Sequence, residues 1–390
     1  MQNRQTNQVF NFDKFPNFEK DIDLKQRAWI EVKGKAIETN VRQLRSKLSK
    51  NCQFMAVVKA DGYGHGAVEV AKQVLASGAT WLAVAFVEEA GVLRREGIEA
   101  PILILSEPRP NEMEEVVKLG GVRPAIYTKA GAEAFSSVAE KESPVHLKVD
   151  TGMHRVGVRP NEIIELANYV LELGIQLEGV FTHFALASSP KDPFNRSQIE
   201  LFDRVLEELS EAGHTPQLVH QANTAATLEW PETHRSMVRV GIGLYGTEPS
   251  KFFSERFKEL GLKPAVWLRS EVSYLQTVES GEGVGYGHRW RAGKNTRIAT
   301  IPIGYADGIF RGWWDGGEVL IGGAHWPIRG VVTMDSLIAE VDDSIEVGDE
   351  VVLLGAQEDS FLAVSDVAEV LGTIGYEILT SLGARIPRRY

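Results

Sequence analysis

Residues with chemical potential fall where short apolar runs of this sequence end. Lys59 follows Met-Ala-Val-Val and precedes the glycine-rich turn Ala-Asp-Gly-Tyr-Gly-His-Gly. A lysine at the end of a buried strand meets a low dielectric, which lowers its pKa and leaves a neutral amine. Such an amine can form a Schiff base with a carbonyl cofactor. A solvated lysine at a loop edge is the alternative, and the glycine-rich turn beside Lys59 favours the reactive interpretation.

A second glycine-rich segment, Gly-Ile-Gly-Leu-Tyr-Gly, contains Gly241, Gly243 and Gly246. It matches the dinucleotide pattern G-x-G-x-x-G, but that pattern should open the first βαβ unit of a chain. Here it follows the last of a series of strand-like runs. The segment therefore favours a cradle of backbone N–H groups for a phosphate.

Arg239 lies just before this cradle, and His183 ends an earlier run. Arginine is one of the usual partners of a pyridoxal ring nitrogen. Because a guanidinium cannot lose its proton, it cannot hold that nitrogen protonated. The ring is then a weaker electron sink, which suits proton transfer without transamination. The alternatives are an ion pair at the rim for Arg239 and a core histidine for His183.

The elements that must position these residues alternate in character. Segments with apolar residues at three- and four-residue spacing separate eight short runs rich in β-branched residues. The runs cover residues 54–60, 81–87, 101–106, 122–127, 145–150, 177–183, 217–221 and 237–241. Eight strand and helix pairs predict a (β/α)₈ barrel of the TIM type, whose reactive residues lie at the C-terminal ends of its strands. A six-stranded doubly wound sheet is the structural rival.

The pattern changes near residue 263. From there short strands alternate with glycine-rich turns, and helical spacing is limited to Ser-Asp-Val-Ala-Glu-Val-Leu-Gly. We therefore expect a barrel domain over residues 28–262 and a mostly β domain over 263–390. The strand-like run 28–32 precedes the barrel and is expected to pair with the β domain. Residues 1–27 form a polar leader whose composition does not require order.

Composition narrows the function classes. A formal net charge of -11 over 390 residues argues against nucleic acid as a partner, because a phosphate backbone requires a basic surface. The single cysteine, Cys52, excludes an intrachain disulfide and is expected to be a buried thiol. The nine histidines lack metal-ligand spacing, so no metal is expected. No signal peptide or membrane-spanning stretch is found, which predicts a cytoplasmic protein without a membrane partner.

Eight motifs occur in order across both parts of the chain: VVKADGYGHG, TGMHRVGV, THFA, ANTAATL, VRVGIGLYG, VGYG, GYADG and VTMD. In this set and order the chain resembles the bacterial alanine racemases from about residue 28 to the C-terminus. The resemblance implies pyridoxal 5'-phosphate (PLP) as the cofactor and L- and D-alanine as substrates. It also implies a homodimer that supplies D-alanine for peptidoglycan.

The resemblance assigns the two proton carriers to Lys59 and Tyr286. Lys59 would carry the cofactor and act on one face of the substrate Cα, and Tyr286 of the other subunit would act on the opposite face. Arg239 would face the pyridine nitrogen, and His183 would lie along the ring. A free tyrosine with a pKa near 10 is a poor base at neutral pH. We therefore expect hydrogen bonds from Tyr286 through His183 to Arg239 to lower its pKa.

The resemblance also assigns the surrounding contacts. Arg155 would approach the phenolic oxygen of the cofactor, and the Met334 backbone would bind the substrate carboxylate. Lys148 matches a lysine that some members carry as a carbamate, which would orient Arg155. Asn223 would contact the cofactor, and Asp335 would line the entrance together with Tyr376. The phosphate would be held by Tyr63, Thr224, Gly241, Ile242 and Tyr376.

The sequence departs from the family pattern at a few positions. Thr224 replaces the usual serine but keeps the hydroxyl, His154 stands where glycine is usual, and Thr333 replaces a frequent cysteine. Asp-Gly replaces Asn-Ala after the motif's lysine and alanine, at positions 61 and 62. The acidic residue expected after Thr-His-Phe-Ala is absent, which leaves the charge of the outer entrance open. None of these changes removes a required functional group.

Two rival functions remain open. A serine or broad-spectrum racemase would use the same chemistry, but relatives of that kind tend to carry Met-Asn where this chain has Met334 and Asp335. A non-catalytic PLP-binding protein built on a similar barrel would lack the β domain. Fold analogy alone does not separate these functions, whereas a second tyrosine such as Tyr286 does.

Overall fold

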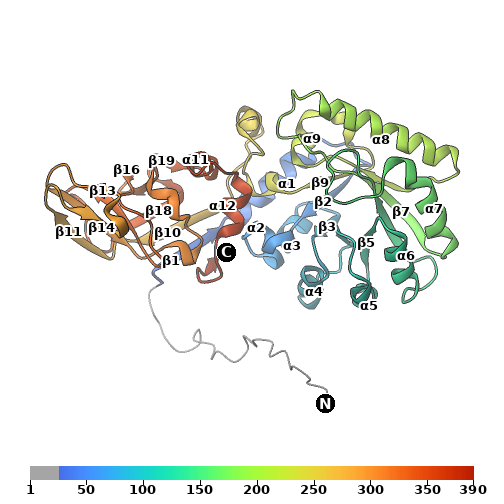
Figure 1. Ribbon diagram of the computed structural model, residues 1–390, viewed down its shortest axis with the longest axis horizontal. Coiled ribbons are helices and arrows are strands. Elements are labelled where there is room, and N and C mark those ends of the chain that lie inside the picture. Colours follow the sequence, from blue (N-terminus) through green and yellow to red (C-terminus); the bar gives the residue numbers. More distant parts are fainter. Residues whose placement is uncertain (1–25) are drawn as a thin grey trace, which may run out of the picture.

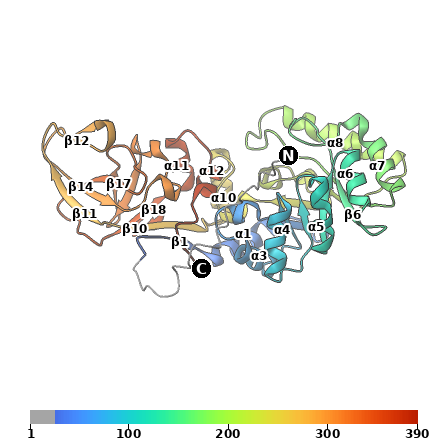
Figure 2. The same cartoon turned by 60° about the horizontal axis from the view of Figure 1, so that its bottom comes forward.

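The computed structural model describes residues 26–390. The predicted leader, 1–27, lies outside the described residues except for Gln26 and Arg27. Two bodies lie side by side along the long axis, one a barrel and the other rich in β-strands (Figures 1 and 2). Within residues 26–390, no helix combines the length and the apolar character needed to cross a bilayer.

The barrel is built from eight parallel strands in the spatial order β8-β7-β6-β5-β4-β3-β2-β9. Their bounds are β2 Gln53–Val57, β3 Trp81–Val84, β4 Ile102–Ile104, β5 Val122–Ile126, β6 Pro144–Lys148, β7 Gln176–Phe181, β8 Leu218–His220 and β9 Met237–Val240. The gap between β8 and β9 is bridged where the Arg239 N–H donates to the Ala222 carbonyl at 2.9 Å. The fold-class prediction is confirmed, and the doubly wound sheet is excluded.

Helices surround the strands because the barrel buries both strand faces. The ring consists of α1 Gly34–Arg45, α3 Ala67–Ala76, α4 Val87–Arg95, α5 Met113–Lys118, α6 Lys129–Ser136, α7 Ile163–Glu172, α8 Phe194–Glu211, α9 Thr224–Glu229 and α10 Ser254–Glu259. Their apolar stripes, such as Ile163, Leu166 and Val170 in α7, are buried. Cys52 is buried beside β2, as expected.

The second body contains one larger sheet, one smaller sheet and a two-stranded hairpin. The larger sheet follows the order β16-β15-β18-β10-β1-β20, with β19 added to β18, and the smaller is β11-β14-β17. The strands are β1 Ala28–Val32, β10 Val266–Glu271, β11 Tyr274–Val278, β14 Thr296–Ile301, β15 Glu318–Ile321, β16 Ala324–Pro327, β17 Leu337–Val341, β18 Glu350–Gln357, β19 Ser360–Leu362 and β20 Arg388–Arg389.

The chain enters the larger sheet before it builds the barrel. Strand β1 pairs with β10 in antiparallel register, with Ile30 opposite Leu268. Strand β20, at the C-terminal end, lies parallel to β1 on its other side. The two ends of the described chain therefore meet in one sheet, although β1 comes before the first barrel strand.

Helices α11 (Val364–Val370) and α12 (Gly375–Ser381) complete the second body. The spacing of apolar residues predicted α11, whereas α12 was not predicted from the sequence. Helix α12 lies against α2 (Lys59–Tyr63) of the barrel. A Cβ on Gly64 would come within 2.3 Å of the Leu379 carbonyl oxygen, so this contact requires glycine. The barrel rim and the second body thus meet beside Lys59.

A hairpin projects from the β-rich body at residues 283–291, which we call the tyrosine hairpin. It pairs β12 (Gly283–Val284) with β13 (Trp290–Arg291), and Tyr286 lies in the short 3₁₀ turn Tyr286–His288 between them. Both ribbon views place this hairpin at the end of the β-rich body that is remote from the barrel (Figures 1 and 2).

Candidate active site

Lys59 begins a left-handed turn just after β2. Residues 60 to 63 all have positive φ, between 51° and 60°. Because only one of these residues is glycine, this conformation costs free energy, about 1 kcal/mol or more for each non-glycine residue. The strand consequently ends at Val57, earlier than the predicted run 54–60. Burial and then the charge of Arg155 lower the pKa of Lys59, and Glu89 opposes this shift.

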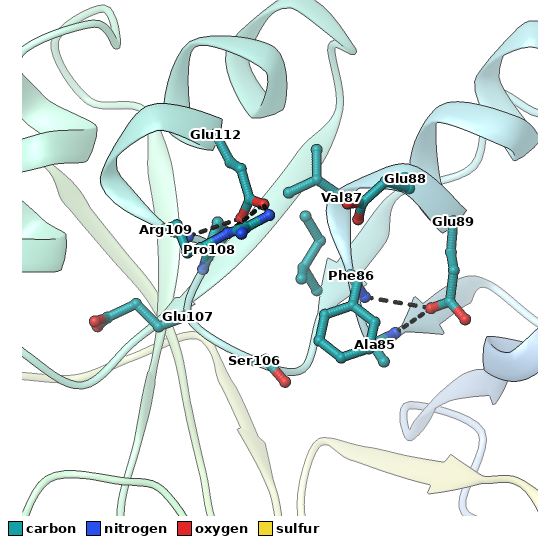
Figure 3. A pocket seen from close by; sticks show the side chains of 11 residues that line it. Ala85, Phe86, Val87, Glu88, Glu89, Ser106, Glu107, Pro108, Arg109 and Glu112 are labelled. Atoms are coloured by element: carbon teal, nitrogen blue, oxygen red, sulfur yellow. Dashed lines mark hydrogen bonds and ion pairs between the residues drawn. The ribbon is translucent and has the colours of Figure 1, made fainter. Parts of the chain in front are cut away.

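The Glu89 carboxylate holds this turn. One oxygen accepts the Ala60 N–H at 2.6 Å. The other accepts the N–H groups of Ala85 at 2.6 Å and Phe86 at 3.2 Å, at the start of α4 (Figure 3). One side chain therefore ties the end of β3 to the residue that follows Lys59, and this offsets part of the cost of the turn.

Glu89 also borders a cavity with a volume of about 470 Å³. The cavity opens between the segments that follow β3 and β4, and Phe86, Pro108 and Arg109 are among its lining residues (Figure 3). None of the residues predicted from the sequence as site residues lines it. Glu89 is thus the link between this cavity and the lysine turn.

Arg239, the third residue of β9, is buried with 4% of its surface exposed. Its Nη1 donates to the carbonyl of His220 at 2.9 Å and to the Nδ1 of that residue at 3.0 Å. Its Nη2 donates to the Thr182 carbonyl at 2.6 Å and to His183 Nδ1 at 3.2 Å. Burial lowers the pKa of Arg239 to about 9, so the guanidinium remains charged at neutral pH. These bonds, with a longer one from Nη2 to the Gln221 carbonyl at 3.4 Å, fix the orientation of the guanidinium.

His183 lies two residues beyond the end of β7. Because a guanidinium only donates, His183 Nδ1 must accept from Arg239, and this assigns the imidazole proton to Nε2. Burial, then the charges of Arg239 and Arg155, hold the pKa of His183 well below its usual value. His183 is therefore a neutral imidazole with one N–H available to donate.

Lys148, at the end of β6, is buried with 6% exposure and donates to the Leu105 carbonyl at 3.4 Å. Burial and then the charge of Arg155 lower the pKa of Lys148 to about 8. Arg155 is exposed on the loop that closes where the Val158 N–H donates to the Lys148 carbonyl at 2.8 Å. The charges of Arg239 and Lys59 act on Lys148 in the same direction. This concentration of positive charge favours an anionic ligand.

The residues of the predicted phosphate cradle lie beside this cluster. A Cβ on Gly241 would come within 2.6 Å of the Tyr63 hydroxyl, so only glycine permits this approach. The Thr224 hydroxyl accepts the N–H groups of Gly241 at 3.1 Å and Gly243 at 3.3 Å. Asn223 caps α9 by accepting the Ala226 N–H at 3.0 Å. Ile242 begins the 3₁₀ turn Ile242–Tyr245 that follows Gly241.

Two tyrosines complete the cradle. The ring of Tyr63 lies 6.1 Å from that of Tyr376, which belongs to α12. Burial raises the pKa of Tyr376 to about 12 and also raises the pKa of Tyr63. Both phenols therefore stay protonated and can donate hydrogen bonds. Because the Thr224 oxygen accepts the two glycine N–H groups, its own hydrogen is left to donate, and this hydroxyl and the two phenols are donors suited to a phosphate group.

Three of the predicted site residues do not join this cluster within the chain. Tyr286 is 73% exposed on the tyrosine hairpin, and Met334 is 52% exposed. The Met334 carbonyl accepts the Ala306 N–H at 3.0 Å, and Asp335 accepts from Arg385 at 2.8 Å. Both contacts lie within the β-rich body.

The sequence-based prediction missed two parts of the site. Glu89 could have been found, because a glutamate at the third position of a helix commonly caps its own N-terminus. His220, which fixes Arg239, lies inside the predicted run 217–221, where nothing distinguishes it from a core histidine. Its partners are distant in sequence, so spacing carries no signal for them.

Comparison with known families covers both bodies. The sequence pattern of the family "Alanine racemase, N-terminal domain" matches residues 32–249. That of "Alanine racemase, C-terminal domain" matches residues 265–390. Both bodies therefore match one family, in the order in which that family places them.

Individual relatives agree with this match. The alanine racemase of Symbiobacterium thermophilum is 40% identical over 376 residues, which is 95% of this chain and 98% of that protein. Alanine racemase 2 of Bacillus subtilis is 40% identical over 381 residues, covering 95% and 96% of the two chains. The crystal structure of alanine racemase from Bacillus anthracis with bound L-Ala-P has a TM-score of 0.87 at 36% identity, covering 94% and 95%.

Proposed function

Because the chain belongs to the alanine racemase family, we propose that it interconverts L-alanine and D-alanine with PLP on Lys59, and with Lys59 and Tyr286 as the two proton carriers. One observation supports this most directly. The end of β2, the end of β9 and α12 bring an amine of lowered pKa, a fixed guanidinium and a phosphate cradle to one rim of the barrel.

The residues at the rim fit PLP. Tyr63, Thr224, Gly241, Ile242 and Tyr376 would hold its phosphate, and Asn223 would support the turn beside it. Arg239 would face the ring nitrogen, and Arg155 the phenolic oxygen. When bound, this cofactor withdraws electrons from the amino acid attached to it, so that the hydrogen on the substrate Cα becomes acidic.

Racemisation requires a proton to leave one face of Cα and another to arrive on the opposite face. Lys59 serves one face, because burial and the charge of Arg155 favour its neutral amine. Tyr286 would serve the other. The neutral His183, whose proton is assigned to Nε2, would donate a hydrogen bond to the phenol oxygen and stabilise its ionised form.

Tyr286 would act in the site of a second subunit. It is highly exposed, and its hairpin lies at the end of the β-rich body remote from the barrel (Figures 1 and 2). A tyrosine in that place cannot reach Lys59 of its own chain without a large rearrangement. We therefore propose a homodimer in which each subunit completes the site of the other.

Three further assignments belong to this proposal. The Met334 backbone would bind the substrate carboxylate, and Asp335 and Tyr376 would line the entrance. Lys148 would carry a carbamate that orients Arg155, because the lowered pKa of Lys148 leaves part of the amine free to react with carbon dioxide. The D-alanine produced would supply peptidoglycan, and a cytoplasmic location stays a prediction.

The test is chiral analysis of L-alanine incubated with the PLP-loaded protein, alongside Lys59→Ala and with L-serine as a second substrate. We expect alanine to approach a racemic mixture, serine to change little and the variant to be inactive. If alanine stays optically pure while PLP is still bound through Lys59, the racemase proposal fails. Rapid racemisation of serine would replace it with a broad-spectrum racemase.

A further inference from the structure

A line of hydrogen-bonded polar side chains crosses the interior of the barrel, starting at Arg239. Arg239 Nη1 lies 3.0 Å from His220 Nδ1, and His220 Nε2 lies 2.8 Å from His146 Nδ1. His146 Nε2 lies 3.2 Å from the Glu178 carboxylate, which also accepts from Arg123 Nε at 3.0 Å. Strands β9, β8, β6, β7 and β5 each contribute one of these residues.

The direction of every bond in this line follows from its two ends. A guanidinium only donates, so His220 Nδ1 must accept and the proton of His220 must lie on Nε2. That N–H donates to His146 Nδ1, which places the proton of His146 on Nε2 as well. The Glu178 carboxylate accepts this last N–H. Both imidazoles are therefore neutral, and each has one assigned tautomer.

Neighbouring residues allow the buried rings of His146 and His220 to meet. Both are fully buried. A Cβ on Gly179, the residue after Glu178, would come within 2.5 Å of His146 Nδ1. Strand β7 therefore needs glycine there for the two imidazoles to meet. The His220 ring stacks on Phe181 at 4.8 Å with an interplanar angle of 6°, which fixes its plane.

Charges at the far end keep the line intact. The bonds from His146 and Arg123 hold the pKa of Glu178 below its usual value, although burial acts to raise it. Burial, then the charge of Arg239, holds the pKa of His220 well below its usual value. Protonation of either imidazole would place two donors face to face, so the neutral forms are the ones compatible with the line.

We propose that His220, His146 and Glu178 are positioning residues that orient the Arg239 guanidinium toward the ring nitrogen of the cofactor from the opposite side of the barrel. This inference rests on the proposed function, because it requires Arg239 to face that nitrogen. None of the three residues needs to touch the cofactor or the substrate. Their effect passes through Arg239 alone.

The first experiment tests the line without the cofactor. ¹⁵N-histidine NMR of the wild-type protein stripped of PLP should show two neutral imidazoles with protonated Nε2 and bare Nδ1. The signals can be assigned by their loss in His146→Asn and His220→Asn. A proton on Nδ1 of either ring, or a charged ring at pH 7, would overturn the proposal whatever the protein catalyses.

The second experiment compares two double variants that differ only in whether residue 178 accepts a hydrogen bond. Arg123→Leu with Glu178→Leu removes the acceptor together with its buried counter-charge. Arg123→Leu with Glu178→Gln keeps an acceptor for His146. Apparent dissociation constants are measured by absorbance titration for PLP and for 1-deazapyridoxal 5'-phosphate, in which a C–H replaces the ring nitrogen. Urea unfolding of both variants checks that each is folded.

We expect the leucine pair to weaken PLP binding roughly 3- to 10-fold and the glutamine pair to remain within about 2-fold of wild type. Binding of the deaza compound should change by less than about 2-fold in both. Equal weakening of both ligands indicates a merely structural role and overturns the proposal. An unchanged affinity for PLP in the leucine pair also overturns it. If the wild type binds neither ligand, the proposed function fails, and the NMR result still decides whether the line exists.

Discussion

The barrel rim and the tyrosine hairpin hold the two proposed proton carriers under opposite conditions. Lys59 is half-buried, its following turn is bound by Glu89, and nearby charges shift its pKa. Tyr286 is 73% exposed at the tip of a short hairpin. Burial and hydrogen bonds within one chain can set the position and the pKa of a group only where the neighbours of that group belong to the same chain. The rim is in this sense a half-site arranged within one chain, whereas the proposed role of the hairpin requires contact with another molecule.

The largest expected effect tests whether the hairpin completes the rim of a second subunit. Tyr286→Phe should slow racemisation of L-alanine roughly 10²- to 10⁴-fold, because general-base catalysis contributes about that much. PLP binding should be unchanged, since the rim is intact. Chiral analysis and absorbance titration measure the two quantities.

Mixing the Tyr286→Phe and Lys59→Ala proteins under conditions that exchange subunits provides the control. A mixed dimer would contain one site with both native residues, so activity should recover to roughly a quarter of the wild-type value. Absence of recovery, despite subunit exchange, would show that Tyr286 does not act across subunits.

The next largest effect concerns the left-handed turn that follows Lys59 at the barrel rim. Glu89→Ala removes the acceptor for three backbone N–H groups, one of them in the left-handed turn after Lys59. We expect a loss of roughly 3 to 4 kcal/mol in the free energy of unfolding, because each charge-assisted bond contributes about 1 kcal/mol or more. Urea unfolding measures it.

Glu88→Ala is the matched control for this variant. Glu88 is the exposed neighbour of Glu89 on the same helix, so its loss should change stability by less than about 0.5 kcal/mol. Equal losses in the two variants would mean that the clamp does not stabilise the turn.

A pH experiment tests the positive charge gathered at the rim. Burial and the charge of Arg155 lower the pKa of Lys148 from 10.5 to about 8, so the folded chain favours the neutral amine more than the unfolded chain does. Between pH 8 and 10.5 the unfolded chain binds more protons, and the stability of the wild type therefore rises with pH in this window. Below it, the buried charge costs the folded protein roughly 3 kcal/mol.

Lys148→Met should therefore be more stable than the wild type at pH 7 by about that amount, and the difference should shrink by pH 9.5. Urea unfolding is measured in bicarbonate-free buffer, because a carbamate would reverse the charge at this position. A difference that does not change with pH would refute the assignment of the lowered pKa to Lys148.

The smallest effect concerns the hydroxyl of Thr224. Thr224→Ser keeps the acceptor for the Gly241 and Gly243 N–H groups and should leave the affinity for PLP within about 2-fold. Thr224→Val removes it and should cost roughly 1 to 3 kcal/mol of stability, because a buried N–H loses its partner. Urea unfolding of the two variants measures this difference. Equal stability of Thr224→Ser and Thr224→Val would show that the hydroxyl contributes nothing to the cradle.

Much of the barrel was predictable because its signals are local. Apolar runs and helical spacing identified eight strand and helix pairs, and the position of Lys59 at the end of the first run indicated the rim. The strand boundary at Val57 was not predictable. The left-handed turn that ends the strand contains Ala60, Asp61 and Tyr63, which normally avoid positive φ. Glu89 stabilises it from another strand and helix unit.

The β-rich body was predictable in class but not in arrangement. Alternating residues indicated strands, whereas the order β16-β15-β18-β10-β1-β20 depends on pairings between distant segments. Helix α12 was not predicted, and the contact it makes joins Tyr376 to Tyr63, which lies in a distant part of the chain.

The sequence by itself therefore determined the fold class, the family and the types of residue at the rim, because these depend on composition and on order along the chain. The tertiary structure decided which of these residues lie close enough to shift one another's pKa values and to form hydrogen bonds. Arg239 and His183 lie 56 residues apart, yet their contact assigns the tautomer of the imidazole. Burial and proximity set pKa values and proton positions, and both are properties of the folded chain that no local pattern encodes.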